Sequence, residues 1–373
     1  MVEWKELGDV CSFRRGKTIT AKNAIEGNIP VIAGGQSPSY YHNQANREGE
    51  SITVAGSGAY AGFVAYWNQP IYVSDAFTVD PSNMLLHKYV FQWLKKNQHR
   101  IFETQKGAGV PHVHGKDISH FQIPVPSLSE QERIVGILDT FTASIDNLKE
   151  QIAQRRKQYA YLIDECFGGT YKKLMDKAET GEIIVEPLSK HGTFIRGRRF
   201  VRTDIVDEGQ PCIHYGDMYT YYGLWADKAK THLPFDFPKK MRYAEKGDVV
   251  IVGAGENNED IGVGLVWQGE EPAAVHDACY IYKTDFQPMF VSYFLRSSIY
   301  HLQIKSNVVR GKICSISSDG IGRALIPTYS VEKQQKIVEM LMPFETLLSN
   351  LEAQLAQRQK QYEYYRNKLL TFE

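Results

Sequence analysis

The sequence predicts an α/β protein built as a tandem duplication, in which two globular domains alternate with two long helices. Three observations support this fold class. Residues 130–167 align without a gap on residues 333–370, with fifteen identities in 38 positions. Fainter matches precede each copy, and each copy carries apolar residues at alternating spacings of four and three. A repeat found at this scale decides the architecture before any single element is considered.

The composition is that of an ordinary globular chain long enough for two or three domains. The 373 residues are 43% hydrophobic, and 43 basic residues balance 43 acidic ones. Any nucleic-acid role must therefore rest on local basic patches. Five cysteines form no CxxC pair, no apolar run approaches 18 residues, and the N-terminus MVEWKELGDV does not resemble a signal peptide. These features predict a cytoplasmic protein without membrane contact.

The repeat defines the expected boundaries along the chain. A proline-containing strand end comes just before each repeated helical segment. It reads IPVPS in the first copy and LIPTYS in the second. We therefore expect a first globular domain at 1–126, a first helical spacer at 127–168, a linker at 169–183, a second globular domain at 184–327 and a second helical spacer at 328–373.

The globular halves contain short strand-like runs separated by Gly and Pro, which is typical of sheets with tight connections. ITVAGSG at 52–58 resembles VVIVGAG at 249–255, and VSDAF at 73–77 resembles VHDAC at 275–279. A helical run follows the strands in each half, at 87–105 and at 287–305. The changing offsets between the matches predict loops of different length on a common scaffold.

The two spacers carry the heptad pattern of a coiled coil. A wider apolar stripe would favour a helix that lies on a globular core, but QRRKQ and QRQKQ keep the flanking positions polar. We expect the two helices to pair antiparallel, with the two domains related by a pseudo-twofold axis. Pro343 is expected to break the second helix, so that a short helix precedes the long one. The expected coiled-coil core consists of Ile134, Leu138, Phe141, Ile145, Leu148, Ile152, Ile337, Leu341, Phe344, Leu348, Leu351 and Leu355.

Three motifs suggest an enzyme, but none is complete. Gly16-Lys17-Thr18 resembles the end of a phosphate-binding loop, yet Cys11 stands where the first glycine belongs. The glycines of 56–62 resemble a dinucleotide fingerprint with one residue too many, and a hairpin turn is the better interpretation. His112 and His114 lack the further ligands of a metal site. We therefore expect no catalytic residues and no metal site.

Basic residues recur at matching positions of the two repeats, where they predict a nucleic-acid surface. Arg side chains bind guanine edges and phosphates, and tyrosines contact sugar and base. The alternative is a solvated charged surface, which is the usual role of a charge cluster. The candidate DNA-binding residues are Arg14, Arg15, Lys17, Lys106, His112, His114, Lys116, Arg196, Arg198, Arg199, Arg202, Tyr219, Tyr221, Arg310 and Lys312.

The chain alternates globular domains with helices, and the first helix begins with an EQxxI motif. This order resembles the specificity subunit of type I restriction–modification enzymes. The junction IPVPSLSEQERIVGILD at 123–139 is close to the hallmark of that family, and GVPHVHGKDISHFQIPVP at 109–126 resembles the end of its target-recognition domains. The resemblance covers essentially the whole chain. The second junction, LIPTYSVEKQQKIVEML, departs from the pattern by one proline and by Lys333 in place of the glutamate.

The resemblance implies a non-catalytic subunit whose two target-recognition domains each read one half of a bipartite, asymmetric DNA site. It implies that the helices set the spacer and bind two modification subunits, which are adenine methyltransferases. S-adenosylmethionine, ATP and Mg are then expected in partner subunits, and no cofactor is expected in this chain. Restriction subunits are expected to join the complex. A duplicated DNA-binding regulator and a coiled-coil protein scaffold that binds no nucleic acid are the alternatives. Steep salt dependence of binding would argue against the scaffold.

Overall fold

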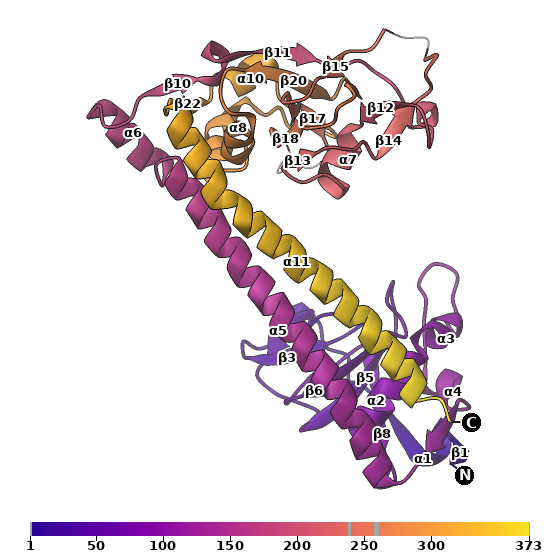
Figure 1. The fold of residues 1–373 in the computed structure, drawn as a ribbon. Coiled ribbons are helices and arrows are strands. Elements are labelled where there is room, and N and C mark those ends of the chain that lie inside the picture. Colours follow the sequence, from indigo (N-terminus) through magenta and orange to yellow (C-terminus); the bar gives the residue numbers. More distant parts are fainter. Residues whose placement is uncertain (1, 238–239, 257–260, 373) are drawn as a thin grey trace. The chain divides into compact units, whose positions relative to one another are not determined.

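The computed structural model describes residues 2–237, 240–256 and 261–372, which fold into two compact units. The first unit comprises Met1–Lys149 and Ala353–Glu373, and the second comprises Glu150–Glu352. Two long helices, α5 (Leu128–Cys166) and α11 (Val331–Leu369), each contribute a segment to both units. Each unit therefore contains one globular domain and one segment of each long helix (Figure 1).

The first unit places its globular domain before α5. A four-stranded sheet has the order β2-β8-β5-β6, a three-stranded sheet has the order β4-β3-β7, and β1 pairs with β9. The strands are β1 (Glu3–Glu6), β2 (Cys11–Arg15), β3 (Ile29–Ile32), β4 (Tyr40–His42), β5 (Glu50–Ala55), β6 (Val64–Asn68), β7 (Tyr72–Val73), β8 (Ala76–Pro81) and β9 (Gln122–Val125). The short helices are α1 (Leu7–Val10), η1 (Ala21–Asn23), α2 (His87–Lys96), α3 (Gln98–Glu103) and α4 (Gly115–Ile118).

The second unit repeats this arrangement with additions. Its sheets have the orders β11-β20-β16-β18-β13 and β14-β12-β19-β15, and β17-β21 and β10-β22 form pairs. The strands are β10 (Val185–Pro187), β11 (Gly192–Arg196), β12 (Gln210–Ile213), β13 (Trp225–Ala226), β14 (Thr231–Leu233), β15 (Tyr243–Ala244), β16 (Val249–Val252), β17 (Ala254–Gly255), β18 (Gly264–Trp267), β19 (Ala273–Val275), β20 (Cys279–Thr284), β21 (Cys314–Ser315) and β22 (Leu325–Pro327). The helices are α6 (Tyr171–Glu179), η2 (Leu188–Lys190), η3 (Arg202–Asp204), α7 (Tyr215–Thr220), α8 (Pro288–Phe294), α9 (Ser298–Ile304), η5 (Lys305–Asn307) and α10 (Ser318–Gly322).

The two units share one topology, which confirms the duplication. The order β2-β8-β5-β6 corresponds to β11-β20-β16-β18, and the parallel pair β3/β7 corresponds to the parallel pair β12/β19. The strand that opens each domain pairs antiparallel with the strand that closes it, β1 with β9 and β10 with β22. Each expected helical run is interrupted, so that α2 and α3, and likewise α8 and α9, are separate short helices.

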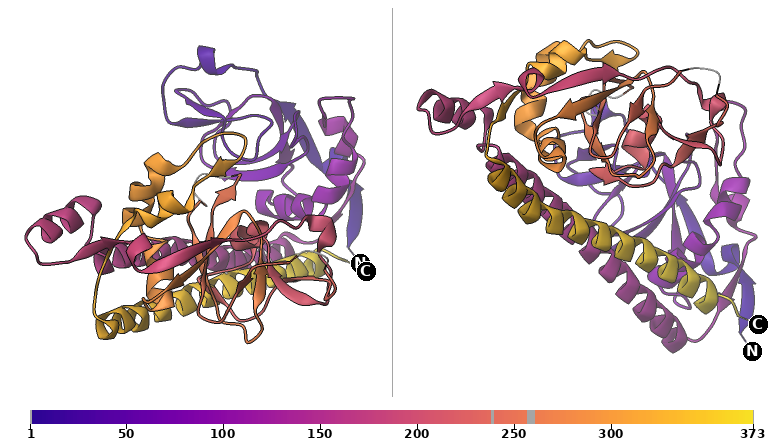
Figure 2. Two further views of the ribbon diagram at one scale, coloured as in Figure 1. Left: turned by 90° about the horizontal axis from the view of Figure 1, so that it is seen from above. Right: turned by 45° about the horizontal axis from the view of Figure 1, so that its top comes forward.

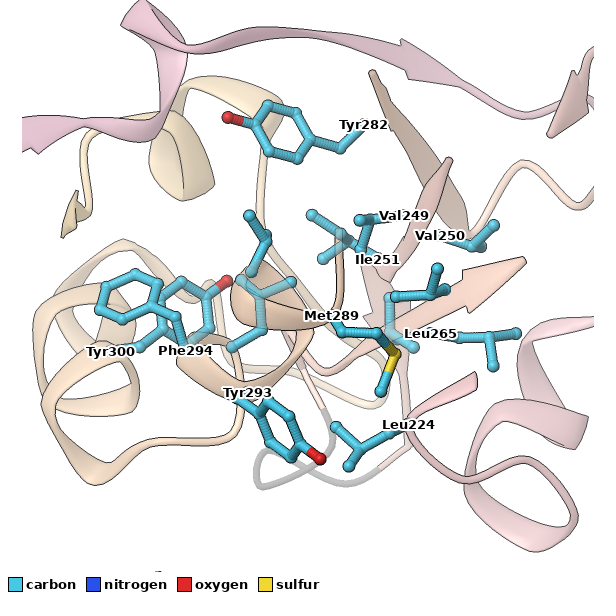
Figure 3. Packing of buried hydrophobic residues seen from close by; sticks show 14 of the residues in the cluster. Leu224, Val249, Val250, Ile251, Leu265, Tyr282, Met289, Tyr293, Phe294 and Tyr300 are labelled. Carbon is cyan, nitrogen blue, oxygen red and sulfur yellow. The ribbon is translucent and has the colours of Figure 1, made fainter. Parts of the chain in front are cut away.

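The core of the second unit packs α8 and α9 against the larger sheet. The central strands β16 and β18 are buried along their whole length, because helices or loops cover both faces. Figure 3 shows Met289 of α8 between Leu224 and Leu265, with Tyr293 and Phe294 on the same helix. In the first unit, α2 occupies the corresponding position and buries Tyr89, Val90, Trp93 and Leu94.

The long helices pair antiparallel in the second unit. Tyr159 of α5 stacks on Phe344 of α11 with ring centroids 6.0 Å apart, and its hydroxyl donates to Glu345 Oε1 at 2.6 Å. Three residues earlier on α5, Arg156 Nη2 donates to Glu352 Oε1 at 2.6 Å, so rising numbers on one helix meet falling numbers on the other. The views in Figure 2 agree with this pairing.

The first unit contains the equivalent pairing. Phe141 of α5 stacks on Tyr365 of α11 with centroids 5.2 Å apart. Phe141 and Phe344 occupy matching positions of the repeat, so each copy of the phenylalanine meets a tyrosine of the other helix. The antiparallel helix pairing expected from the heptads is therefore present in each unit.

The expected coiled-coil core is apolar and inward-facing throughout. Eight of its residues are buried, and Phe141, Leu148, Phe344 and Leu355 are half-buried. Several of the buried ones have a second role that heptad spacing does not predict. Ile134 and Leu138 join the core of the first globular domain, and Ile337 and Leu341 join that of the second. Each helix thus begins as part of a domain core and continues as a partner of the other helix.

The expectation that Pro343 breaks the second helix is wrong. α11 runs unbroken from Val331 to Leu369 with Pro343 inside it, and its 39 residues equal the length of α5. Proline removes the hydrogen bond to the carbonyl of Glu339, four residues earlier. Both residues are exposed, so water can solvate that carbonyl, while the apolar stripe on the other face remains buried.

A buried glutamine fastens each long helix to its domain. Gln131 Nε2 donates to the carbonyls of Met84 and Pro126, and its Oε1 accepts the backbone N–H of Leu86, all at 2.9 Å. Leu86 is the residue that caps the N-terminus of α2. The side chain of Gln131 therefore satisfies three backbone groups at the point where α2 meets α5.

Gln334, the repeat equivalent of Gln131, repeats this bridge. Its Nε2 donates to the carbonyl of Tyr329 at 2.8 Å, and its Oε1 accepts the N–H of Gln287, the N-terminal cap of α8, at 2.8 Å. Gln131 is fully buried and Gln334 is 3% exposed. The glutamine common to both junction motifs is thus a structural bridge.

Replacing either bridging glutamine with alanine should destabilise the chain by about 1–3 kcal/mol, because buried backbone groups lose their partners. Urea unfolding of Gln131→Ala and Gln334→Ala measures this loss. Gln335→Ala is the matched control, since Gln335 is exposed on the same helix and its side-chain amide donates to the exposed Glu339 one turn later. A loss in Gln334→Ala no larger than in Gln335→Ala would contradict the bridge.

Candidate nucleic-acid interface

A hollow of about 290 Å³ opens in the first globular domain between β2, β8 and the segment that leads into α4. It brings together four of the candidate residues, Arg15, His112, His114 and Lys116. We call it the first hollow. Its lining is Phe13, Arg15, Gly56, Asp75, Ala76, Phe77, His112, Val113, His114, Gly115 and Lys116.

The second globular domain has a matching hollow of about 300 Å³, the second hollow. Repeat positions correspond between the two: Arg196 takes the place of Arg15, Asp277 that of Asp75, and Ser315 and Ser317 those of the two histidines. The lining is Arg196, Gly253, Ala254, Asp277, Tyr280, Asn307, Val309, Ser315, Ile316 and Ser317. The duplication has therefore kept the position of the hollow and changed most of its side chains.

The arginine of each hollow stands at the end of an edge strand whose backbone is held by a second arginine. Arg47 Nη2 donates to the carbonyl of Arg15 at 3.3 Å, and Arg242 Nη1 donates to that of Arg196 at 2.5 Å. Arg196 Nε also donates to the carbonyl of Asp277 at 2.8 Å, which orients the guanidinium. Both arginines are exposed and can meet a ligand.

The other walls differ in chemistry. In the first hollow Asp75 accepts a hydrogen bond from the Ser57 hydroxyl, and the rings of His112 and His114 stack with centroids 6.3 Å apart. In the second hollow hydroxyl groups replace the imidazoles, and the Tyr280 hydroxyl donates to the carbonyl of Ile316 at 3.2 Å. The two hollows therefore present different sets of donors and acceptors.

Two of the candidate cations in the first domain are engaged in ion pairs. Arg14 points to the opposite face of β2 from Arg15 and forms a bidentate pair with Asp80 at 2.7 and 2.8 Å. Burial opposes ionisation of Asp80, but hydrogen bonds from Arg14 and Thr78 outweigh it and lower the pKa of that carboxyl. Lys106 Nζ meets the buried Asp117 Oδ1 at 2.6 Å.

The remaining candidates lie on the surface of their domains, with one exception. The exception is Tyr219, which is half-buried, contacts Gly255 and donates its hydroxyl to the carbonyl of Ala254 at 3.3 Å. This placement favours a structural role. Tyr221 is exposed and carries Lys230 over its ring. The others, all exposed, are Lys17, Arg198, Arg199, Arg202, Arg310 and Lys312.

The sequence patterns missed Asp75 and Asp277 as members of the site. The matched segments VSDAF and VHDAC contain both, and an aspartate recurring beside recurring arginines is the signal that could have found them. The interpretation of 56–62 as a turn is correct, since this segment connects β5 to β6 with Gly58 and Gly62 at φ +88° and +89°.

Within the described residues, no group of three or more His, Cys, Asp and Glu side chains could hold a metal ion. In the same part of the chain, no helix is both long enough and apolar enough to cross a bilayer.

Comparison with known protein families identifies the N-terminal part of the chain. Residues 1–155 match the type I restriction modification DNA specificity domain. The Haemophilus influenzae protein S.HindORF215P, provisionally named a type I restriction enzyme specificity subunit, is 24% identical over 404 residues, covering 100% of this chain and 96% of the relative. The EcoR124I/EcoR124II specificity subunit of Escherichia coli is 27% identical over 313 residues, covering 78% and 72%.

Solved structures agree with these relatives in fold. The S subunit of a type I restriction–modification system from M. genitalium superposes with a TM-score of 0.64 at 18% identity, covering 100% of this chain and 97% of that one. A chain from a study of complex assembly in the type I system gives a TM-score of 0.55 at 16% identity. The family resemblance predicted from the sequence is confirmed.

Two histidines, the buried His276 and the half-buried His214, lie next to Asp277 of the second hollow. His276 precedes Asp277, contacts His214 with ring centroids 4.8 Å apart, and uses both ring nitrogens: Nε2 lies 3.0 Å from the carbonyl of Phe200, and Nδ1 accepts the N–H of Ala278 at 3.0 Å. These bonds fit the neutral ring. Burial is the main cause that lowers the pKa of both histidines, although Asp277 raises that of His276 and Asp217 raises that of His214.

We expect stability to fall in acid because of this pair. Since folding lowers both pKa values, the unfolded chain binds more protons, and stability is lost as the pH falls below the unfolded histidine pKa of about 6.5. Urea unfolding from pH 7.5 to 5.5 should show a smaller loss in His276→Asn than in the parent, because the amide oxygen can accept from Ala278 without titrating. His99→Asn, which alters an exposed histidine, is the control and should follow the parent. An unchanged pH dependence in His276→Asn would refute this assignment.

Proposed function

We propose that this chain, a specificity subunit of the type I restriction–modification family, recognises DNA with both globular domains, each reading one half of a bipartite, asymmetric site. The observation that carries the proposal is the pair of repeat-related hollows, each lined by an exposed arginine whose backbone carbonyl is bonded by a second arginine. The name of the matched family and those of the relatives support the same role.

The chemistry of the hollows suits the edges of base pairs. An arginine presents two parallel N–H groups to the O6 and N7 acceptors of guanine, which is the commonest specific contact in the major groove. The carboxylate beside it accepts from an exocyclic amino group. The exposed cations around the hollows, Lys17, Arg198, Arg199, Arg202 and their neighbours, suit phosphate contacts that position a domain without reading sequence.

The differences between the hollows account for an asymmetric site. Imidazole groups in the first hollow can donate to guanine or accept from adenine, and Lys116 can donate to guanine. Ser315, Ser317 and Asn307 in the second hollow offer hydroxyl and amide groups at other positions. One scaffold with two sets of side chains should therefore select two different half-sites.

The paired helices are proposed to fix the spacer between the half-sites and to dock two modification subunits. The duplication supports two equivalent docking surfaces, since each long helix presents the same QRxKQY segment. The chain is then the non-catalytic reader of the complex. We propose that S-adenosylmethionine is bound by the modification subunits, and that ATP and Mg are bound in partner subunits.

Arg15→Ala should relax recognition of one base pair in one half-site, and Arg196→Ala should do so in the other. A bidentate arginine–guanine contact discriminates by about 1–3 kcal/mol, or roughly 5- to 150-fold. Methylation sequencing of cells that express each variant with its modification subunits measures this change.

The matched control is Arg14→Ala, which alters the neighbouring residue on the same strand. Because Arg14 faces Asp80, its loss should lower stability slightly and leave the recognised sequence intact. Relaxed recognition in Arg14→Ala but not in Arg15→Ala would refute the assignment of the first hollow.

Exchange of residues 184–327 for the corresponding domain of a relative should change one half-site only. The other half-site and the spacer length should persist, because the first domain and the helices are unchanged. Methylation sequencing of cells carrying the chimera reads all three quantities at once. Simultaneous change in both half-sites would mean that the domains do not read DNA independently.

A further inference from the structure

Beside each hollow lies a five-residue loop closed by residues that line the hollow, His112 in the first domain and Val309 and Ser315 in the second. The fourth residue of each loop, which we call the tip, is an exposed, β-branched apolar side chain. The first loop is closed by two backbone hydrogen bonds between Lys106 and His112, of 3.0 and 2.8 Å. The second is closed in the same way between Val309 and Ser315, at 2.8 and 3.0 Å. The fourth loop residue is Val110 in one domain and Ile313 in the other, 203 positions apart like the helices.

The apolar tips are not explained by packing. Val110 is 54% exposed and Ile313 is 62% exposed. A single exposed valine or isoleucine is common on protein surfaces. Here the same position is apolar and exposed in both domains, although the three preceding residues differ completely, Gly-Ala-Gly in one loop and Arg-Gly-Lys in the other.

The first loop is held in a defined shape that projects its tip. Gly107 has φ +114°, and a Cβ there would lie 2.5 Å from the carbonyl oxygen of Val110, so only glycine fits. Three residues beyond each tip, Val113 and Ile316 are buried and anchor the loop to the domain. The tip is therefore held in a defined position, two residues before His112, which lines the first hollow.

The surroundings of the tips are those of a DNA surface. His112, His114 and Lys116 follow the first tip in the sequence and line the first hollow, and Arg310 and Lys312 stand beside the second tip in its loop. An apolar side chain cannot bind a phosphate, because it has neither a charge nor a hydrogen-bond donor. In the major groove, where the arginine of the same hollow would read guanine, the apolar group on the base edges is the C5-methyl of thymine.

We propose that Val110 and Ile313 are specificity-determining residues that each pack against a thymine methyl group in the half-site read by their own domain. The proposal rests on the proposed function, the recognition of DNA by both domains. It adds that each half-site contains an A·T pair read by contact with the methyl group.

The test uses the full chain in complex with its modification subunits, on duplexes that carry the site identified by methylation sequencing. Each thymine of a half-site is replaced in turn by uracil, which removes only the methyl group. One replacement in the first half-site should weaken binding of the parent about fourfold, the value for one buried methylene-sized group, and should leave Val110→Ala unaffected. Ile313→Ala should show the same insensitivity in the second half-site only.

The controls separate the tips from exposed apolar residues elsewhere. Ile25→Ala and Ile184→Ala remove similar exposed side chains from the first and second domains and should keep the parent's response to uracil. Val110→Ile, which keeps an apolar tip, should retain the response as well.

The possible results separate a failure of the methyl contact from a failure of the proposed DNA recognition. Failure of the parent complex to prefer its site over unrelated DNA would overturn the proposed function. Specific binding with equal responses to uracil in the parent and in Val110→Ala and Ile313→Ala would overturn the methyl contact alone. A half-site without an A·T pair, or a tip that instead unstacks bases as detected by 2-aminopurine fluorescence, would overturn it too.

Discussion

Burial of one apolar face on each of two antiparallel helix segments is the constraint on which each unit depends. Neither segment could remain a stable isolated helix with that face in water. At one end of each helix the face closes a domain core, through Ile134 and Leu138 in the first unit and Ile337 and Leu341 in the second. Further along, the same face meets the partner helix through an aromatic stack. The bridging glutamine lies before both, in the first turns of each long helix, and fastens the helix to its domain because it bonds backbone groups of that domain.

The arrangement explains how the domains can diverge in recognition while the scaffold persists. The features repeated in both copies are structural: the antiparallel closure of first and last strand, the parallel strand pair, the glutamine bridge and the aromatic stack. The features that differ lie at the hollows, where imidazoles in one domain are replaced by hydroxyl groups in the other. Side chains at such a position can change without loss of core packing, since they are exposed or half-exposed.

Charge alone is a poor guide to the reading residues. Arg14 and Arg15 are adjacent, yet strand alternation directs one to Asp80 and the other to the first hollow. Lys106 forms an ion pair with the buried carboxylate of Asp117. Burial acts to raise the pKa of that carboxyl, but the pairing helps to lower it overall. The net charge of zero is consistent with this distribution, in which several cations serve structure and a smaller set faces the hollows.

The sequence by itself determined the duplication, the α/β class, the two long helices and the face that each of them buries. It could do so because heptad spacing and repeated motifs are local properties of the chain. The family resemblance followed from the junction motifs for the same reason. Even so, local rules failed at Pro343, where burial of the apolar stripe outweighs the loss of one exposed hydrogen bond.

Only the tertiary structure decided which residues form the site. Arg15, Asp75 and His112 are far apart in the sequence and meet because β2, β8 and the loop before α4 converge. The role of Gln131 likewise depends on the N-terminus of α2, forty-five residues away. Which neighbours a side chain meets is set by the pairing of distant strands and helices, and no spacing rule along the chain encodes that pairing.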